Sequence, residues 1–336
     1  MSSAAPAGDD AMATPPSHPW RRLFGWLLVV ATLGFLALTI ARQWDELSAL
    51  EWRLEPLPFI GSIALLVATL GWGVWIWQRV LRRLGVAIAL RPLLRIWFLA
   101  TLARYVPGKI WQFVGAAQLA RRYGVPAVPL VTSMVVHMGF TMAAAVILGT
   151  PLLAARLIAD DRVALAVSVL VGLAVVVAVH PRPVNVGLDL LPRALHREVL
   201  RWEASWSYAL LLLLWSVVSW IAYGAAFTLF AAAIFDVSID AVPGLVAANA
   251  VAVLAGVLAV VAPAGLGARE LALSFLLQPL LPVQGAGALL ALLSRLWVMI
   301  GEVVGAGLSV LLAPIPRSQT SAVPPQGEAR NADPQG

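Results

Sequence analysis

The stretch LARYVPGKIWQFVGAAQLARR, residues 102–122, interrupts a long apolar region with a Pro-Gly pair. It carries four basic residues and no acidic one, and Lys109 is the only lysine of the chain. The wider segment 79–122 holds nine of the 23 Lys and Arg residues and no Asp or Glu. A helix breaker and clustered charge are both costly in hydrocarbon, so each needs contact with protein or water.

Composition places the chain in a membrane. Of its 336 residues, 61% are hydrophobic and only 12% are charged, which is far outside the usual range of soluble domains. The formal net charge is +6, but the basic residues flank apolar runs, as orientation in a membrane requires. We therefore expect no nucleic-acid partner.

Signatures of catalysis are missing from the sequence. The chain has no cysteine, and its four histidines are scattered along it, so neither thiolate chemistry nor a metal site is expected. We find no P-loop, no Ser-His-Asp set and no paired-carboxylate motif. The sequence therefore predicts no catalytic residue, no metal and no cofactor.

The chain divides into one membrane domain and two tails. Residues 1–19 and 314–336 are rich in Pro, Ala and polar residues, with too little apolar area to offset the entropy of ordering. We expect both tails to be disordered and cytoplasmic, and residues 20–313 to form the membrane domain. After Pro316 only 20 residues remain, which leaves no room for a further folded domain.

The predicted fold class is an all-α polytopic membrane protein. An apolar run of about 20 residues crosses roughly 30 Å of hydrocarbon as a helix. In the apolar run 286–312, Gly301 and Gly305 form a Gly-x-x-x-Gly pair, which favours close packing of helices. Six runs have this length: residues 23–41, 57–78, 127–150, 163–180, 206–234 and 286–312.

Two further apolar stretches are interrupted. Residues 92–123 break at Pro107-Gly108, and residues 245–281 break at APAGLGARE, residues 262–270, so each stretch predicts two helices with a break between them. Non-helical backbone at membrane depth is tolerated only against protein or a water-filled cavity. Both breaks therefore predict a cavity. For the first break, a surface turn between two interfacial helices is the alternative.

The distribution of charges predicts how the chain is oriented. Loops that begin at residue 79 and residue 181 are basic and so cytoplasmic, whereas Asp236 and Asp240 lie in an acid-only loop outside. With six full spans, both termini are then cytoplasmic, and the two broken stretches are re-entrant from opposite faces. Such a pair indicates an inverted repeat, an arrangement that surrounds the substrate site in transporters. The excess of Arg over Lys favours a bacterial inner membrane.

Charges around the first break form one half of the predicted binding site. A helix that starts after Gly108 exposes unpaired N–H groups and a partial positive charge, which favour an anion. Arg104 and Lys109 add charge there, and guanidinium groups bind phosphate oxygens in a bidentate manner. The predicted substrate-binding residues of this half are Arg104, Pro107, Gly108, Lys109 and Arg121.

The second half of the predicted site lies in the C-terminal part of the chain. Arg295 and Glu302 are seven residues apart and share one helix face, which we expect to point inward because charges in lipid are costly. These charges either contact the substrate or form internal ion pairs, Arg295 with Glu270 or Arg269 with Glu302. The predicted residues of this half are Gly265, Gly267, Arg269, Glu270, Arg295 and Glu302.

The segments ARYVPGKIWQF (103–113), ARRYGV (120–125) and APAGLGARE (262–270) resemble the transmembrane region of lysylphosphatidylglycerol synthases and its stand-alone flippase-like relatives. The resemblance extends over about residues 20–313. It implies a polytopic domain with re-entrant elements that moves a lipid between leaflets. The chain departs from the synthases at its C terminus, where the aminoacyltransferase domain has no room, so we expect no synthesis of the lysyl-lipid.

The sequence thus predicts a flippase-like transporter of an anionic or phosphate-linked lipid. The expected partners are a membrane lipid with an anionic headgroup and a lipid-modifying enzyme. A non-transporting membrane subunit of a lipid, glycolipid or hopanoid biosynthesis pathway is the alternative. A membrane-embedded transferase with Glu270 or Glu302 as a base is less favoured because no nucleophile accompanies either residue.

Overall fold

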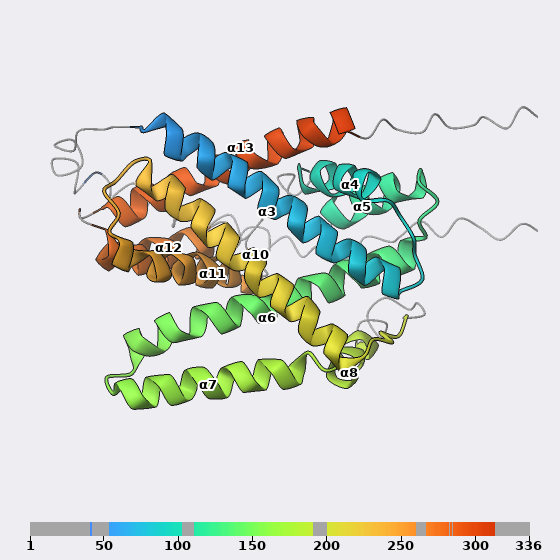
Figure 1. Ribbon diagram of the computed structural model, residues 1–336, viewed down its shortest axis with the longest axis horizontal. Coiled ribbons are helices and arrows are strands. Elements are labelled where there is room, and N and C mark those ends of the chain that lie inside the picture. Colours follow the sequence, from blue (N-terminus) through green and yellow to red (C-terminus); the bar gives the residue numbers. More distant parts are fainter. Residues whose placement is uncertain are drawn as a thin grey trace, which may run out of the picture.

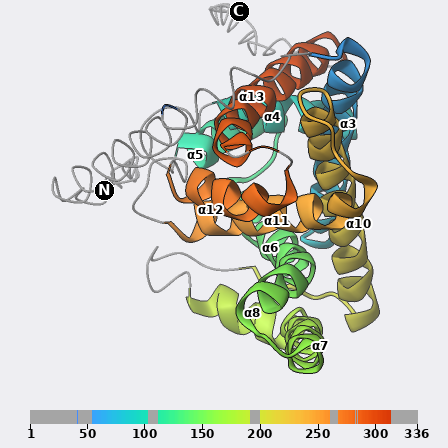
Figure 2. The same ribbon diagram turned by 90° about the vertical axis from the view of Figure 1, so that its left-hand side faces the viewer.

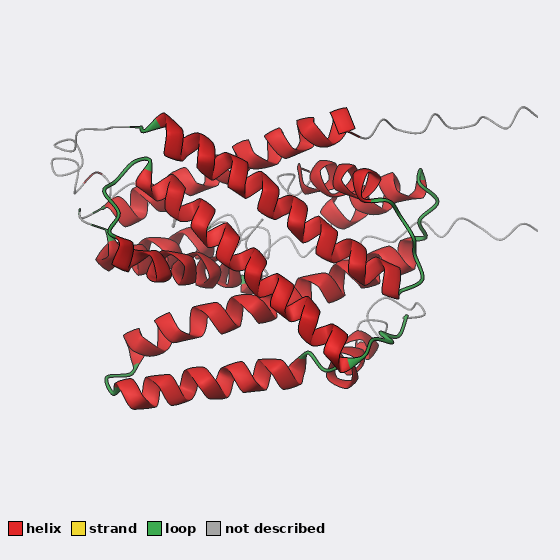
Figure 3. Ribbon diagram, viewed as in Figure 1, coloured by secondary structure: helices red, strands yellow, loops and turns green. Residues whose placement is uncertain are grey.

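The computed structural model describes residues 41, 54–102, 111–190, 200–259, 267–281, 283 and 285–312. Within these ranges the chain is helical and contains no strand (Figure 3). The helices are α3 (Pro56–Arg83), α4 (Leu90–Leu102), α5 (Trp111–Arg121), α6 (Ala127–Leu157), α7 (Asp161–Ala178), α8 (Pro181–Leu190), α10 (Trp206–Ala232), η2 (Ile239–Ala241), α11 (Val242–Leu258), α12 (Ala268–Leu277), η4 (Gln278–Leu280) and α13 (Ala286–Leu312).

Six helices of the described ranges are long and apolar enough to cross a membrane, which confirms an all-α polytopic membrane protein. Five of them match predicted apolar runs: α3, α6, α7, α10 and α13. The sixth is Ile239–Leu258, formed by η2 and α11, which the sequence analysis had placed inside a broken stretch. The predicted run 23–41 lies outside the described residues except for Ala41.

Local signals set several helix boundaries. The N-cap of α7 is Asp160, whose carboxylate accepts hydrogen bonds from the backbone N–H groups of Arg162 (2.8 Å) and Val163 (3.2 Å). Helix α6 continues through Pro151, although the sequence predicted its end at Thr150. The Thr150 hydroxyl donates to the Val146 carbonyl at 2.7 Å within this turn. A proline removes one helical hydrogen bond, here the one to the Ile147 carbonyl, and membrane helices tolerate such a loss where neighbouring groups pack against it.

The helices run between two ends of an elongated bundle (Figure 1). At one end, called here the α3-start end, the Glu55 N–H donates to the carbonyl of Ala233 just after α10 (2.9 Å). At the opposite end, called the α3-finish end, Gln78 donates to the Ile88 carbonyl (2.7 Å) in the loop that leads to α4. Trp77 near the finish of α3 also donates to Ser133 of α6 (2.8 Å), so α6 starts at that same end.

Two short helix pairs enter the bundle from opposite ends. Helices α4 and α5 follow the α3-finish end and return to it before α6, and Figure 1 shows them together. Helix α11 starts at the α3-start end, and a Cβ on Gly244 in its first turn would meet Leu280 just after α12. Helices α11 and α12 therefore run antiparallel and return to their own end. This arrangement agrees with the predicted entry of the two broken stretches from opposite ends. Re-entrance into a membrane and an inverted repeat stay predictions.

Helix α13 contacts both helix pairs. A Cβ added to Gly287, near its start, would lie 2.7 Å from the Ser274 carbonyl oxygen of α12. Near its other end, a Cβ on Gly305 would overlap the Phe98 ring of α4, and one on Gly301 would overlap Leu66 of α3. The Gly-x-x-x-Gly pair thus allows the close helix packing that the sequence predicted.

The core is a set of apolar contacts shared by the long helices. Phe227, Phe230 and Trp297 pack together where α10 meets α13. Helix α7 instead has one buried residue, Ala164, and Figure 2 shows it with α8 on the side of the bundle opposite α13. The sequence analysis treated the chain from residue 181 as a loop, but α8 forms there. The Asn185 amide nitrogen of α8 donates to the Trp202 carbonyl, and its oxygen accepts from the Trp202 N–H.

Candidate functional site

A buried group of charged side chains lies at the start of α12. Arg269 is 7% exposed and Glu270 is 2% exposed, and Ser294 of α13 beside them is fully buried. Arg295 of α13 completes the group, with its side chain 21% exposed. These four residues are called here the α12–α13 polar cluster.

Gly267 and Glu270 fix the start of α12. Gly267 has a φ of 96°, a conformation that favours glycine because it has no Cβ. Its backbone N–H donates to Oε2 of Glu270 at 2.8 Å, so the first turn carries its own acidic cap. The carboxylate also complements the partial positive charge of the helix start.

The other carboxylate oxygen of Glu270 faces both arginines. Its Oε1 atom lies 3.4 Å from Nη1 of Arg295 and 3.6 Å from Nη1 of Arg269. The same Arg269 nitrogen donates to the Ser294 hydroxyl at 3.1 Å, and that hydroxyl donates to the Ala291 carbonyl at 2.7 Å. The structure thus contains the predicted ion pair of Arg295 with Glu270. Arg269 contacts the Glu270 carboxylate and donates a hydrogen bond to Ser294.

The cluster lies well inside the bundle. Ser294 and Arg295 are the ninth and tenth residues of the 27-residue helix α13, which places them roughly 13 Å from its start at 1.5 Å per residue. A hydrocarbon core is about 30 Å thick, so a spanning α13 would hold these charges near mid-depth. Buried charge at that depth is costly and marks functional sites in membrane proteins.

One arginine nitrogen of the cluster has no hydrogen-bond partner among the described residues. Nη2 of Arg269 is buried and has no hydrogen bond to any described residue. Two guanidinium groups and one carboxylate contact each other here, which leaves one positive charge among the three. A buried donor without an acceptor costs about 1–3 kcal/mol and more when charged, so an anionic oxygen would stabilise this group.

The remaining predicted residues are Glu302, Arg121 and five residues of the two breaks. Glu302 is 2% exposed and lies two turns after Arg295, on the same face of α13. Arg121 lies on the exposed surface in the last turn of α5, where the chain leads into α6, and so is not part of the polar cluster. Four residues of the first break, together with Gly265 of the second, lie outside the described residues: Arg104, Pro107, Gly108, Lys109 and Gly265.

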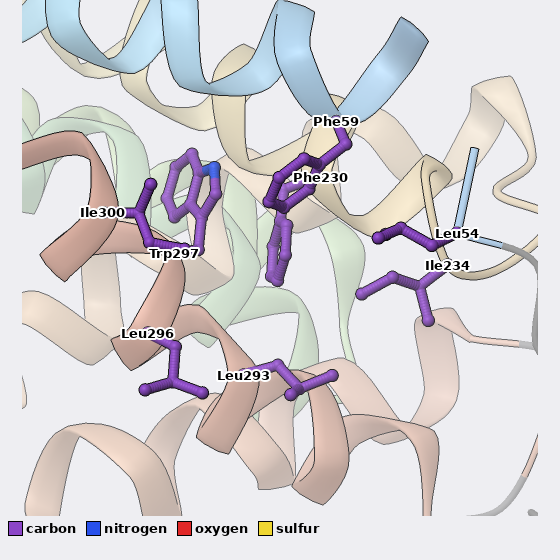
Figure 4. A pocket seen from close by; sticks show the side chains of 8 residues that line it. All are labelled: Leu54, Phe59, Phe230, Ile234, Leu293, Leu296, Trp297 and Ile300. Carbon is purple, nitrogen blue, oxygen red and sulfur yellow. The ribbon is translucent and has the colours of Figure 1, made fainter. Parts of the chain in front are cut away.

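An apolar pocket opens on another face of α13 (Figure 4). Its volume is about 380 Å³, and it lies near the α3-start end of the bundle. Trp297 forms one wall, and its indole N–H donates to the Ser62 hydroxyl at 3.0 Å. The lining side chains are all apolar: Leu54, Phe59, Phe230, Ile234, Leu293, Leu296, Trp297 and Ile300.

The sequence analysis missed Ser294 and the pocket. Ser294 immediately precedes Arg295, but one serine in an apolar helix gives no signal that separates it from a helix-packing residue. The pocket residues come from α3, α10 and α13, and their apolar character matches that of the surrounding spans. Only the spacing of Leu293, Leu296, Trp297 and Ile300 along one face of α13 could have indicated part of it.

Long apolar helices and charges held inside the bundle place the chain among polytopic helical membrane proteins. A family model described as "Lysylphosphatidylglycerol synthase TM region" matches residues 23–301. The chain therefore belongs to this family, as the two break motifs predicted. No curated protein matched the chain in a sequence search.

Proposed function

We propose that the protein moves a lipid with an anionic or phosphate-linked headgroup between the leaflets of a bacterial inner membrane. The α12–α13 polar cluster carries the proposal, because its Arg269 has a buried guanidinium nitrogen with no acceptor among the described residues. A phosphate or similar anion would supply that acceptor. Membership of the lysylphosphatidylglycerol synthase TM family supports a role connected with lipids.

The opposed helix pairs support a route for the headgroup. Helix α12 reaches α13 from the α3-start end, and α4 reaches it from the α3-finish end. In transporters, broken helices that enter from the two membrane faces surround a site to which each face gains access in turn. We include Arg104 and Lys109 of the first break in the headgroup site on the basis of their sequence positions.

The apolar pocket supports a place for the lipid tail. Leu296 is 57% exposed and Ile300 is 43% exposed, so the pocket is open on the surface of α13. If α13 spans the membrane, that surface faces hydrocarbon, and an acyl or prenyl chain fits a lining without polar side chains. Headgroup and tail would then contact different faces of one helix.

A translocation assay tests the proposal. The protein is reconstituted into vesicles that contain fluorescent phosphatidylglycerol or fluorescent phosphatidylcholine, and dithionite measures how fast label reaches the outer leaflet. We expect the protein to accelerate movement of phosphatidylglycerol above the rate in protein-free vesicles, and to act less on phosphatidylcholine. Equal, protein-independent rates for both lipids would contradict transport of a lipid chosen by its anionic headgroup.

A non-transporting membrane subunit is the second candidate. One observation favours it: Glu270 already accepts from Gly267 and contacts both arginines, which is also what a purely structural cluster needs. The two functions differ in the vesicle assay. A subunit of a biosynthetic pathway would move no lipid by itself and would instead co-purify with a lipid-modifying enzyme.

A further inference from the structure

A second cationic group lies at the α3-finish end, separate from the polar cluster. The guanidinium of Arg79 lies over the Trp75 ring, 4.6 Å from its centroid. The guanidinium of Arg83 lies over the ring of Tyr208 of α10, 4.2 Å from its centroid. The Tyr208 hydroxyl donates to the Arg79 carbonyl at 3.2 Å, which fixes this ring between the two helices.

Aromatic side chains continue this group toward the middle of the bundle. Trp72 stacks on Trp75 with centroids 4.7 Å apart, and Trp75 contacts Trp215 of α10 with centroids 4.6 Å apart. The indole N–H of Trp72 donates to the Trp215 carbonyl at 3.3 Å. We call the six residues Trp72, Trp75, Arg79, Arg83, Tyr208 and Trp215 the α3–α10 seam.

The seam has the polarity of a membrane lipid along its length. Its four α3 residues follow one another at intervals of three, four and four, so they share one face of the helix. From Trp72 to Arg83 the seam extends roughly 16 Å along the axis, with both arginines in the last two turns of α3. Charge thus lies at the end of the span and aromatic surface lies deeper. A lipid in a leaflet has the same order, with its phosphate at the surface and its acyl chains deeper.

The two guanidinium groups retain capacity for an anion. Within the part of the chain that the structure describes, neither Arg79 nor Arg83 forms an ion pair or a side-chain hydrogen bond. Stacking on a ring uses the flat face of a guanidinium and leaves its N–H edge available for phosphate oxygens. The two arginines are one helical turn apart, roughly 6 Å along the axis, and lie on the same face of α3.

The surface beside the seam is open. Trp72 is 39% exposed, Leu211 of α10 is 39% exposed, and Arg83 is also exposed. Figure 1 shows α3 and α10 lying side by side on one side of the bundle. A lipid in the surrounding leaflet therefore has direct access to the seam without entering the bundle.

We propose that the α3–α10 seam binds an anionic phospholipid from the leaflet at the α3-finish end, at a site distinct from the transport site. The phosphate lies between Arg79 and Arg83, and the upper part of an acyl chain packs on Trp72 and Trp215. A phosphate diester satisfies the guanidinium edges, while the tail covers aromatic surface that is otherwise exposed. A zwitterionic lipid would bind more weakly because its ammonium group offsets the phosphate charge.

Site-specific photo-crosslinking tests the seam directly. Benzoylphenylalanine replaces Leu211, and the protein is placed in vesicles of equal phosphatidylglycerol and phosphatidylcholine. Mass spectrometry of the cross-linked lipid then reports which lipid occupies this site rather than the polar cluster. Two arginines near an anionic lipid predict a cross-linked ratio of phosphatidylglycerol to phosphatidylcholine roughly tenfold above the bulk ratio.

Variants separate binding by the seam from general attraction to a basic protein. R79Q/R83Q should return the cross-linked lipid to the bulk ratio, whereas R156Q/R162Q, which removes two exposed charges at the α6–α7 turn, should keep the enrichment. R79K/R83K keeps the charge but loses the flat stacking, so it should give an intermediate ratio. If R79Q/R83Q does not fold, the single variant R83Q at its exposed position carries the same test.

Two results would overturn the proposal. One is a cross-linked lipid mixture that matches the bulk ratio in the otherwise unmodified protein. The other is an enrichment that R79Q/R83Q, or R83Q alone, leaves unchanged.

Discussion

Glu270 is the residue on which the α12–α13 polar cluster depends. It caps Gly267 and faces both Arg269 and Arg295, so removal of its charge takes away the carboxylate that both guanidinium groups contact. Breaking a buried ion pair from one side is strongly destabilising, whereas removing both partners is far less so. A single carboxylate therefore stabilises the start of one helix and the middle of another.

A double-mutant cycle on Glu270 and Arg295 measures this dependence. We expect E270Q to lower the free energy of unfolding by about 3–5 kcal/mol. R295M should cost less in the E270Q background than in the unmodified protein, because the pair is then already broken, with a coupling of roughly 1 kcal/mol or more. Chemical unfolding in mixed micelles provides the measurement.

The control for this cycle is R156M, at an exposed position on the α6–α7 side of the bundle, which should show no coupling with E270Q. An R295M effect that is the same in both backgrounds would show that the 3.4 Å contact contributes nothing measurable to stability.

At the scale of single helices, α13 contacts both short helix pairs as well as α3. It contacts α12 through Gly287 and Ser294, α3 through Gly301, and α4 through Gly305. Gly287, Gly301 and Gly305 lie where atoms of neighbouring helices approach closely, whereas Gly307 on the same helix has open space around it. Small residues therefore set the distance between α13 and its neighbours.

Replacement of two nearby glycines of α13 tests this packing. G305L should clash with the Phe98 ring and destabilise the protein by about 1–3 kcal/mol, since overpacking forces backbone shifts. G307L adds the same volume and the same apolar area at an open position, so we expect a change within about 0.5 kcal/mol. Thermal unfolding of both variants in the same detergent compares them, and equal losses would exclude a specific α13–α4 contact.

Sequence patterns predicted the long spans and also the helices on either side of each break, α4 with α5 and α11 with α12, but they missed α8. Runs of apolar residues with the length of a bilayer span indicate a helix by themselves, so α3, α6, α7, α10 and α13 were correct. Helix α8 was missed because its ten residues include Arg182, Asn185 and Asp189, which resemble a loop between spans. It is held by hydrogen bonds between Asn185 and Trp202, a contact over 17 residues that no local pattern contains.

The candidate site was predictable to the same limited extent. Charged residues in apolar helices stand out in a sequence, so Arg269, Glu270 and Arg295 were found. Their mutual distances depend on how α12 lies against α13, which sequence alone does not determine. For that reason two ion-pair arrangements were left open, and the structure shows Arg295 with Glu270.

At the scale of the whole molecule, the opposite entry of the two helix pairs predicts which loops share a side of the membrane. The loop after α3 contains Ala87, and the loop after α10 contains Asp236, and both residues are exposed at opposite ends of the bundle. If the bundle axis follows the membrane normal, these two loops face different compartments. The basic residues near Ala87 predict that its side is cytoplasmic.

Cysteine labelling measures this topology with little background, because the natural chain has no cysteine. In intact cells, a membrane-impermeant maleimide should label D236C, and it should label A87C only after the membrane is permeabilised. A further variant, D160C in the α6–α7 turn, should behave as D236C does. Labelling of A87C and D236C from the same side would contradict the opposite entry of the helix pairs.

We propose that the α12–α13 polar cluster recognises the headgroup of a transported anionic lipid. The most direct measurement is the ratio of phosphatidylglycerol to phosphatidylcholine translocation rates in vesicles that contain R269Q, compared with the unmodified protein and with R156Q. We predict that R269Q, shown to be folded, loses most of the phosphatidylglycerol rate and brings the ratio close to one, while R156Q changes neither. An unchanged rate and ratio in folded R269Q would contradict the claim.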